Sequence, residues 1–431
     1  MIPAMNDYSE HLIDLAVSAA AAGRFAAAQE LLCLTVGHSG RDAFVLYGIG
    51  HMAWQQDHFA AAVAWLDQSL AIDASNPKAH IDRGLALFGL RRDREALESL
   101  ERGLAMDPDL ALAVLTEGID QLRAGDFRRG WWKFEARLIA SPGILPRRVF
   151  SQPRWFGDPA EVAGRTLLLH SEQGHGDAIQ FVRYVPDVAA MGATVLVEGH
   201  KGLLPLYRGM PGVSGVFALN DPLPPYDVQC PILSLPLAFR TGLATIPGDV
   251  PYLAPPPDRV PFWQRLLGQR PPGRLRIGIA WSGNPAYPAD RDRSIPLAAL
   301  EPLLAGTDHA FHIVQTEIRE TDRPVLMRHG YLRDHSERLA DFGDTAALLS
   351  QLDLLIAVDT SVAHLGSALG MPVWLLLPAH ADWRWLTGRN DSPWYPTMRL
   401  FRQGSAGAWG GVVDRVLRAL ASEGARDRIG P

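Results

Sequence analysis

A polar segment that follows a strongly apolar run has the residue types needed to bind a charged ligand. Residues 354–358 read Leu-Leu-Ile-Ala-Val and are followed by Asp359-Thr360-Ser361-Val362-Ala363-His364. The apolar run predicts a parallel strand covered on both faces, and Thr360 or Ser361 could cap a helix that begins after it. Free N–H groups at a helix start attract phosphate, and open α/β sheets bind ligands where their strands end. We therefore expect a ligand site at residues 359–364.

A glycine-containing turn offers a second place where a ligand could approach the backbone. The apolar residues 167–169 are followed by His170 and then by Ser-Glu-Gln-Gly-His-Gly-Asp at 171–177. The two glycines permit a tight turn, and Asp177 falls in the first turn of the predicted helix. The third glycine of a dinucleotide-binding fingerprint is absent. Asp177 could be a catalytic acid or base, or it could only stabilise the helix dipole.

Two further loops carry charges and aromatic rings. Residues 282–285 (Ser-Gly-Asn-Pro) and 290–294 (Asp-Arg-Asp-Arg-Ser) follow a predicted strand. The two arginines could neutralise a diphosphate, or they could simply pair with the aspartates of the same solvated loop. Residues 381–385 read Ala-Asp-Trp-Arg-Trp. Trp383 and Trp385 suit stacking on a sugar or a base, and they equally suit ordinary packing.

The sequence does not favour a metal site or a serine hydrolase. His309 and His312 lie in or beside a predicted strand, where they would point to opposite faces, and no cysteine or histidine cluster completes a ligand set. Ser171 and Ser282 lack the Gly-x-Ser-x-Gly turn of an activated serine. We therefore expect no metal and no bound cofactor.

The elements that must position these loops form two regions of alternating strands and helices. Strands are predicted at 166–170, 194–198, 213–219, 276–281, 310–315, 354–359 and 373–377, and helices at 178–191, 296–305, 344–351 and 362–369. Prolines cluster at 247, 251 and 255–257, as in an interdomain linker. These patterns predict two Rossmann-like domains, residues 163–257 and 258–431, with an active site in the cleft between them.

The first 140 residues repeat with a period of 34. The repeated columns contain Gly50, Gly84 and Gly118; Ala28, Ala62, Ala96 and Gly130; Leu32, Leu66, Leu100 and Phe134; and Phe25, Phe59 and Phe127, with Asp93 as the exception. Small residues recur where two helices must touch. This pattern resembles the tetratricopeptide repeat over residues 8–140, which predicts a helical repeat domain at 1–140 and a connector at 141–162. Such arrays bind proteins or peptides in a groove, or serve as spacers or dimerisation elements.

The composition argues against nucleic-acid-binding, secreted and membrane-spanning proteins. A net charge of −6 over 431 residues argues against nucleic acid as the main partner, because phosphate binding needs a basic face. The two cysteines are far apart, and the apolar stretch 12–22 is preceded by acidic residues, unlike a signal peptide. No stretch reaches the roughly 18 apolar residues of a membrane span. We therefore expect a cytoplasmic protein.

The order of elements resembles that of GT-B glycosyltransferases. The glycine turn ending in Asp177, the Ser-Gly-Asn loop and the Asp-Thr-Ser-x-Ala-His segment occupy the places of similar motifs in the heptosyltransferase-like group. Tetratricopeptide repeats fused to such a domain also resemble protein O-glycosyltransferases, including the O-GlcNAc transferase type and bacterial flagellin-modifying enzymes. The resemblance covers residues 163–415 at the level of the fold.

This resemblance implies roles for individual residues. Asp177 matches the general base for the acceptor hydroxyl, and His175 is a second candidate because imidazole titrates nearer neutral pH. An aspartate base would need a raised pKa to serve near neutrality. The implied donor-binding residues are Gly176, Ser282, Asn284, Arg291, Arg293, Gln315, Asp359, Thr360, Ser361, Val362, His364, Asp382 and Trp383. The Asp-Arg-Asp-Arg loop departs from the single basic residue of the group, which leaves the donor open.

The predicted function is therefore metal-independent transfer of a sugar from a nucleotide donor to a Ser or Thr hydroxyl of a protein held by the repeats. Flagellin is one candidate acceptor. The donor could be a UDP-linked sugar or a CMP-linked nonulosonic acid. The sequence does not determine whether the sugar configuration is inverted or retained, and a homo-oligomer is possible. One alternative is an inactive scaffold that only binds protein. Another is a transferase that acts on lipopolysaccharide or another glycan.

Overall fold

The structure, a computed structural model, describes residues 4–140, 148–270, 272–287, 289–328, 330 and 332–422. The first part of the predicted connector, residues 141–147, lies outside them. The chain divides into two compact units, Met1–Gln121 with Arg128–Arg148, and Leu122–Phe127 with Val149–Pro431. We refer to them as the repeat unit and the α/β unit. Among the described residues, no helix is long and apolar enough to cross a membrane.

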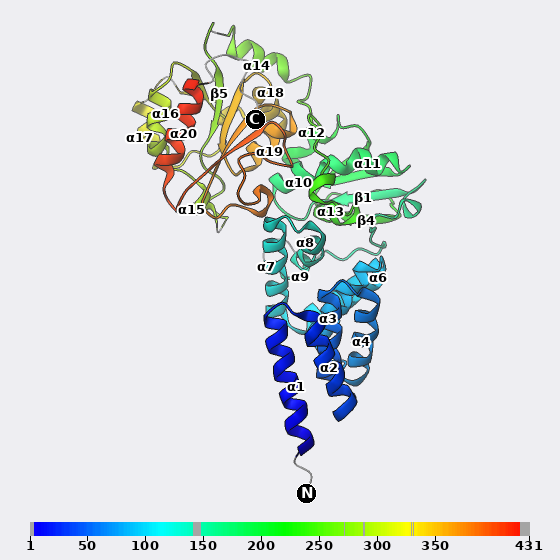
Figure 1. The fold of residues 1–431 in the computed structure, drawn as a ribbon. Coiled ribbons are helices and arrows are strands. Elements are labelled where there is room, and N and C mark those ends of the chain that lie inside the picture. Colours follow the sequence, from blue (N-terminus) through cyan, green and yellow to red (C-terminus); the bar gives the residue numbers. More distant parts are fainter. Residues whose placement is uncertain are drawn as a thin grey trace. The chain divides into compact units, whose positions relative to one another are not determined.

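Consecutive helices pair as antiparallel hairpins along the first part of the chain (Figure 1). They are α1 (Ala4–Ala21), α2 (Phe25–Ser39), α3 (Ala43–Gln55), α4 (Phe59–Ile72), α5 (Pro77–Gly89), α6 (Asp93–Met106), α7 (Pro108–Ala124), α8 (Phe127–Phe134) and the short α9 (Arg137–Ala140). The second helix of each hairpin begins at residue 25, 59, 93 or 127, so the predicted 34-residue period is confirmed. Local capping sets some of the starts: the Asp42 carboxylate accepts hydrogen bonds from the first N–H groups of α3, and Asn76 does so for α5, where Pro77 follows.

The repeated glycines lie where the two helices of a hairpin approach each other. A Cβ atom on Gly50 would lie 2.6 Å from Leu66 Cγ, and one on Gly84 would lie 2.8 Å from the carbonyl oxygen of Ala96. Neither distance is compatible with a side chain unless a neighbour moves. The small-residue column predicted from the sequence is therefore a helix-packing requirement.

Replacing Gly84 by alanine is expected to destabilise the repeat unit by about 1–3 kcal/mol, because the new methyl group would meet backbone atoms of α6. Gly37→Ala is a matched control, since Gly37 lies in α2 and a Cβ there would meet nothing within 4 Å. That change should be neutral or should stabilise by about 0.5–1 kcal/mol through helix propensity. Thermal unfolding followed by circular dichroism measures both. Equal effects of the two substitutions would contradict the packing role.

The first sheet of the α/β unit has four parallel strands in the order β3-β2-β1-β4. The strands are β1 (Thr166–His170), β2 (Thr194–Gly199), β3 (Val213–Ala218) and β4 (Val228–Pro231), and the helices are α10 (His175–Phe181), α11 (Val185–Ala190), α12 (Leu204–Tyr207) and α13 (Leu235–Ala238). The single helix predicted at 178–191 is wrong: α10 ends at Phe181, and a 3₁₀ turn separates it from α11, whose first turn contains Pro186. The short strand β4 was not predicted.

The second sheet has six parallel strands in the order β10-β9-β8-β5-β6-β7. The strands are β5 (Arg276–Ala280), β6 (Ala310–Ile313), β7 (Arg333–Asp334), β8 (Leu354–Val358), β9 (Val373–Leu377) and β10 (Met398–Arg402). The helices are α14 (Val260–Leu267), α15 (Asp290–Arg293), α16 (Leu297–Ala305), α17 (Arg323–Arg328), α18 (Phe342–Leu349), α19 (Ser361–Ala368) and α20 (Trp409–Ser422). This is the strand order of a doubly wound Rossmann sheet, with its reversal between β5 and β8. The predicted fold class, helical repeats followed by a pair of Rossmann-like domains, is confirmed.

Short 3₁₀ turns connect several of these elements. They are η1 (Pro159–Glu161), η2 (Val182–Tyr184), η3 (Lys201–Leu203), η4 (Ile232–Ser234), η5 (Leu243–Thr245), η6 (Ser336–Arg338) and η7 (Trp383–Trp385). The last of these, η7, carries the aromatic loop that follows β9.

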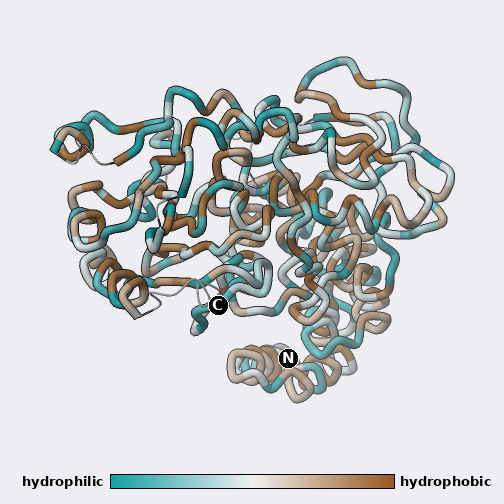
Figure 2. Tube along the Cα trace, turned by 90° about the horizontal axis from the view of Figure 1, so that it is seen from above, coloured by the Kyte–Doolittle hydropathy of each residue, from teal (hydrophilic) through white to brown (hydrophobic). Residues whose placement is uncertain are grey.

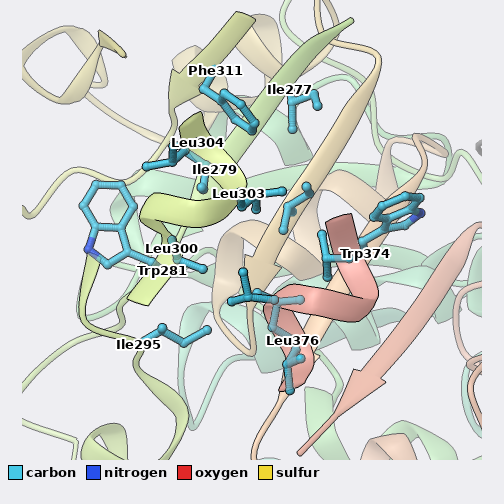
Figure 3. Packing of buried hydrophobic residues seen from close by; sticks show 14 of the residues in the cluster. Ile277, Ile279, Trp281, Ile295, Leu300, Leu303, Leu304, Phe311, Trp374 and Leu376 are labelled. Carbon is cyan, nitrogen blue, oxygen red and sulfur yellow. The ribbon is translucent and has the colours of Figure 1, made fainter. Parts of the chain in front are cut away.

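One face of the second sheet carries a core formed with α16 and α20. Figure 3 shows Ile277 and Ile279 of β5, Leu300 of α16, and Trp374 and Leu376 of β9 within this cluster, and all five are buried. Hydrophobic and hydrophilic stretches alternate along the chain (Figure 2), as expected when strands are buried and their connections are exposed. The buried strands fix where the polar segments begin, because each strand ends at the edge of the core.

The proline-rich linker is held by both α/β domains. Tyr252 and Leu253 donate backbone hydrogen bonds to the Ala368 carbonyl at the end of α19, and the Tyr252 hydroxyl donates to the Ile179 carbonyl in α10. The Arg183 guanidinium also donates to the Pro247 carbonyl. The linker is therefore packed against the domains that it joins.

Candidate functional site

The guanidinium of Arg384 in η7 joins polar residues from both α/β domains. It forms an ion pair with the Asp177 carboxylate of α10, and its Nε donates to Gln180 Oε1 at 2.6 Å. Its Nη1 donates to Asp382 Oδ1 at 2.9 Å. The Arg384 side chain is only 8% exposed, and the guanidinium lies 4.4 Å from the centre of the Trp383 ring. Arg384 is therefore a buried cation held in place on several sides.

Asp177 has two partners, one local and one from the other domain. Its Oδ2 accepts a hydrogen bond from the Gly174 N–H at 2.9 Å, which closes the start of α10, and its Oδ1 faces Arg384. The local contact is the helix-stabilising role considered from the sequence. The contact with Arg384 was not predicted, and it brings Asp177 to the polar segments of the second sheet.

Asp359 lies directly after β8, and its side chain is 15% exposed. The Trp385 Nε1–H donates to Asp359 Oδ2 at 2.7 Å, and Arg293 Nη1 donates to the Asp359 carbonyl at 2.7 Å. Burial, reinforced by the nearby negative charge of Asp382, raises the pKa of Asp359 to about 6. The Asp359 carboxyl can therefore hold a proton close to neutral pH.

Asp359→Asn is expected to stabilise the protein near pH 7.5 by up to about 3 kcal/mol and to have little effect below about pH 4. The folded-state pKa of Asp359 is about 6, whereas that of an unfolded aspartate is about 3.9. The free energy of unfolding of the wild type therefore falls as pH rises from about 4 to about 6. Asparagine mimics the protonated carboxyl and can still accept from Trp385. Denaturant unfolding of both proteins at the two pH values measures the difference. A gain of the same size at both values would contradict the raised pKa.

His364 lies one turn into α19 and is neutral. Burial, together with the positive charges of Arg384, Arg183 and Arg293, lowers the pKa of His364 well below its usual value. Its Nδ1 lies 2.9 Å from the Tyr395 hydroxyl. A Cβ on Gly176 would lie 2.9 Å from His364 Cδ2, so the second glycine of the turn lets α10 approach α19.

The start of α19 is not capped by a side chain. Thr360 occupies the N-cap position, but its hydroxyl donates weakly to the Val358 carbonyl at 3.3 Å. We expected Thr360 or Ser361 to cap the helix, and this expectation is wrong for Thr360, which occupies the N-cap position without a side-chain cap. The Thr360 carbonyl accepts from the N–H groups of Ala363 and His364. The N–H groups of the half-buried Ser361 and Val362 lie in the first turn, where a helix has no internal acceptors for them.

Gln315 positions the loop after β5. Its Oε1 accepts from the Trp281 N–H at 2.8 Å and from the Ser282 N–H at 3.3 Å, while its Nε2 donates to the Ser282 hydroxyl at 3.0 Å. The Asn284 side chain is exposed, and its Oδ1 accepts from the Ala286 N–H within the following turn. Gln315 and Ser282 therefore support the loop backbone.

The Asp-Arg-Asp-Arg segment is the short helix α15, and its two arginines differ. The Arg291 side chain is 93% exposed and lies 3.7 Å from Asp292. Arg293 is 22% exposed, pairs with the buried Asp290, and reaches the Asp359 carbonyl. Only Arg293 is brought to the residues after β8. The pairings within the segment that we considered from the sequence are present.

The aromatic residues of the site also differ in exposure. Trp383 and Trp385 are buried, and Trp383 packs beneath the Arg384 guanidinium, which is the packing alternative considered above. Tyr287 is 48% exposed, and the Arg293 guanidinium lies 4.8 Å from the centre of its ring. Tyr287 was missed in the sequence.

His175 is stacked between other rings. The ring centre lies 4.2 Å from that of His200 and 5.1 Å from that of Phe342. Burial, together with His200, lowers the pKa of His175 to about 4. Near neutral pH the ring is uncharged and only a weak proton acceptor.

No cluster of three or more His, Cys, Asp or Glu side chains that could hold a metal ion occurs within the described part of the chain. The acidic residues of the site are instead paired with Arg384, Arg293 and Trp385.

Comparison with known proteins finds relatives of low similarity. No protein-family model matches the sequence. Protein FlbA of Caulobacter vibrioides (strain ATCC 19089 / CIP 103742 / CB 15) is 26% identical over 421 residues, which is 91% of this chain and 69% of that protein. ADP-heptose LPS heptosyltransferase II of E. coli is 14% identical with a TM-score of 0.45, covering 60% of this chain and 98% of that chain. A mutant of the Thermobaculum terrenum O-GlcNAc transferase is 16% identical with a TM-score of 0.28, covering 89% of this chain and 84% of that chain.

Proposed function

We propose that this chain is a glycosyltransferase that moves a sugar from a nucleotide donor to a hydroxyl group of a protein. The observation that carries the proposal is the meeting of Asp177, from the turn after β1, with Arg384 and Asp382, from the loop that follows β9. Ligands of open α/β sheets bind at the carboxyl ends of strands near the reversal of strand order. Here such an edge offers both a proton acceptor and anion-binding groups.

The donor phosphates would lie at the start of α19. The N–H groups of Ser361 and Val362 can donate to phosphate oxygens, and Arg293 supplies a positive charge next to the Asp359 carbonyl. The half-exposed ring of Tyr287 offers a face for a base or a sugar. Together these groups would stabilise the negative charge that develops on the departing phosphate.

The transfer step would need a base near the acceptor hydroxyl. Asp177 would take the hydroxyl proton while the oxygen forms a bond to the anomeric carbon of the sugar. The bond from that carbon to the phosphate oxygen would break, and its electron pair would leave on the nucleotide phosphate. His175 is the weaker candidate, because its lowered pKa leaves little driving force for proton uptake.

The repeat unit would hold the polypeptide acceptor. Phe44 in α3 and Leu112 in α7 are 60% and 57% exposed. They are two repeat periods apart in the sequence, so they occupy equivalent positions of their helices. Exposed apolar side chains at equivalent positions of stacked repeats suit an extended polypeptide.

Intact-mass analysis of a co-expressed candidate acceptor tests this function. We expect a mass gain equal to one or more sugar residues with the wild-type chain, and a smaller gain with a Phe44→Ala/Leu112→Ala double variant. Purified protein, acceptor and a panel of UDP-sugars and CMP-nonulosonic acids identify the donor. Modification of lipopolysaccharide and not of protein would support the glycan alternative. No transfer from any donor, together with stable binding of the acceptor, would overturn the proposal in favour of a scaffold.

A further inference from the structure

Arg384 is a buried charge of the site, and the two carboxylates that it contacts differ in origin. Asp382 belongs to the same loop, and its Oδ1 also accepts from the Arg384 N–H at 3.0 Å. Asp177 comes from α10 of the other α/β domain, and its side chain is 20% exposed. Solvent reaches both carboxylates, but Asp382, which is 35% exposed, is fixed by the backbone of its own loop, whereas Asp177 belongs to a separate element.

We propose that Arg384 is a phosphate receptor of the donor site, and that the Asp177 carboxylate occupies it when no donor is bound. This inference rests on the proposed glycosyltransferase function. The donor phosphate would replace the carboxylate, and the freed carboxylate would then be able to accept the acceptor proton. Donor binding would therefore come first and would activate the base.

The geometry of the guanidinium supports a receptor role. An arginine has five N–H donors, and the contacts with Gln180, Asp382 and Asp177 use three of them. One N–H on each Nη has no partner among the described residues. Two N–H groups in the plane of a guanidinium suit an oxyanion such as phosphate.

The packing indicates that Asp177 moves and Arg384 stays. The Arg384 guanidinium lies 4.4 Å from the centre of the Trp383 ring and 5.7 Å from that of Phe181, while Gln180 holds its Nε. These contacts preorganise the cation without the help of Asp177. By contrast, the carboxylate of Asp177 could rotate away from Arg384 and still accept from the N–H of Gly174, the N-cap residue of α10.

The charges around Arg384 favour replacement of one carboxylate by the phosphate. Arg384 already faces the carboxylates of Asp177 and Asp382, and Asp359 lies close enough to affect its ionisation. A diphosphate would add further negative charge to the same cation. The phosphate and the carboxylates of Asp177 and Asp382 would repel each other around one buried guanidinium. The phosphate would therefore bind most tightly once the Asp177 carboxylate has moved away.

Isothermal titration with nucleotides tests the exchange directly. The probes are the common nucleoside diphosphates, cytidine monophosphate and inorganic pyrophosphate, and the last of these separates phosphate recognition from base recognition. Asp177→Asn is expected to bind the preferred nucleotide about tenfold more tightly than wild type, because a competing state is removed. Asp187→Asn is the matched control: it removes one negative charge from the exposed surface of α11 in the same domain, and it should leave affinity unchanged. Arg384→Lys should weaken binding by at least about tenfold, because lysine lacks the planar pair of donors.

The outcomes separate this inference from the function on which it rests. Binding of a nucleotide by wild type, with equal or weaker binding by Asp177→Asn, would overturn the exchange and leave the transferase function standing. Binding of no nucleotide by any of the proteins would overturn both. Circular dichroism and thermal unfolding establish that each variant is folded. If Arg384→Lys does not fold, the comparison of Asp177→Asn with Asp187→Asn decides the question alone.

Discussion

Asp177→Asn is expected to lower the rate of sugar transfer by about 10²- to 10⁴-fold, the range lost when a general base is removed. The amide keeps the size of the carboxyl group, and its oxygen can still accept from the Gly174 N–H that starts α10. It cannot take a proton from the acceptor hydroxyl. Initial rates of acceptor mass gain at saturating donor measure the loss. The folded structure should be retained, since Arg384 keeps Asp382 as its counter-ion.

Two controls make this prediction specific. His175→Gln should reduce the rate far less than Asp177→Asn, because the His175 ring is stacked on His200 and has a lowered pKa. Asp187→Asn, in the exposed helix α11, should leave the rate unchanged. The more informative readout is the combination of lost turnover with retained or tighter nucleotide binding. A variant at position 177 that turns over as fast as wild type would remove Asp177 as the base and would direct attention to Asp359.

Seven of the ten strands in the described residues, and the polar segments after them, could be predicted because both follow from local patterns, whereas β4, β7 and β10 were not predicted. The apolar run at 354–358 became β8 with the bounds predicted from its composition, apart from the final aspartate. The 34-residue period likewise appears as helix starts at 25, 59, 93 and 127. A buried parallel strand needs a continuous apolar run, and a helical hairpin needs small residues at its contact, so each leaves a direct trace in the sequence.

The central contacts of the site could not be predicted because they join distant residues. Arg384 and Asp177 are 207 positions apart, and neither neighbourhood indicates its partner. The short strand β4 was missed for a related reason: its four residues are stabilised by pairing with β1, and they contain a proline that argues against a strand. Thr360 shows that residue type alone does not determine a side-chain contact. Threonine is a common N-cap residue, but the Thr360 hydroxyl donates to the Val358 carbonyl.

Asp290→Ala is expected to destabilise the α/β unit by about 3 kcal/mol, because it removes a buried carboxylate shared by two arginines. The Asp290 side chain is 3% exposed, and it accepts from Arg293 Nε at 3.1 Å, from the Ser294 hydroxyl at 3.0 Å and from the Arg319 guanidinium. Without it, the two guanidinium groups would face each other with no counter-ion. Arg293 and Arg319 are 22% and 32% exposed, so water can partly solvate the two charges. The expected loss of unfolding free energy is therefore at the lower end of the range for broken buried pairs.

Asp292→Ala provides the matched control for this loss. It lies two residues away on α15 and also faces an arginine, but its side chain is 70% exposed and the pair with Arg291 is 3.7 Å long. Such a surface pair contributes about 0–1 kcal/mol, so the substitution should shift the urea midpoint little. Asp290→Ala should in addition weaken nucleotide binding, because Arg293 would lose the partner that directs it toward the Asp359 carbonyl. Similar midpoints for the two variants would show that Asp290 does not organise the donor loop.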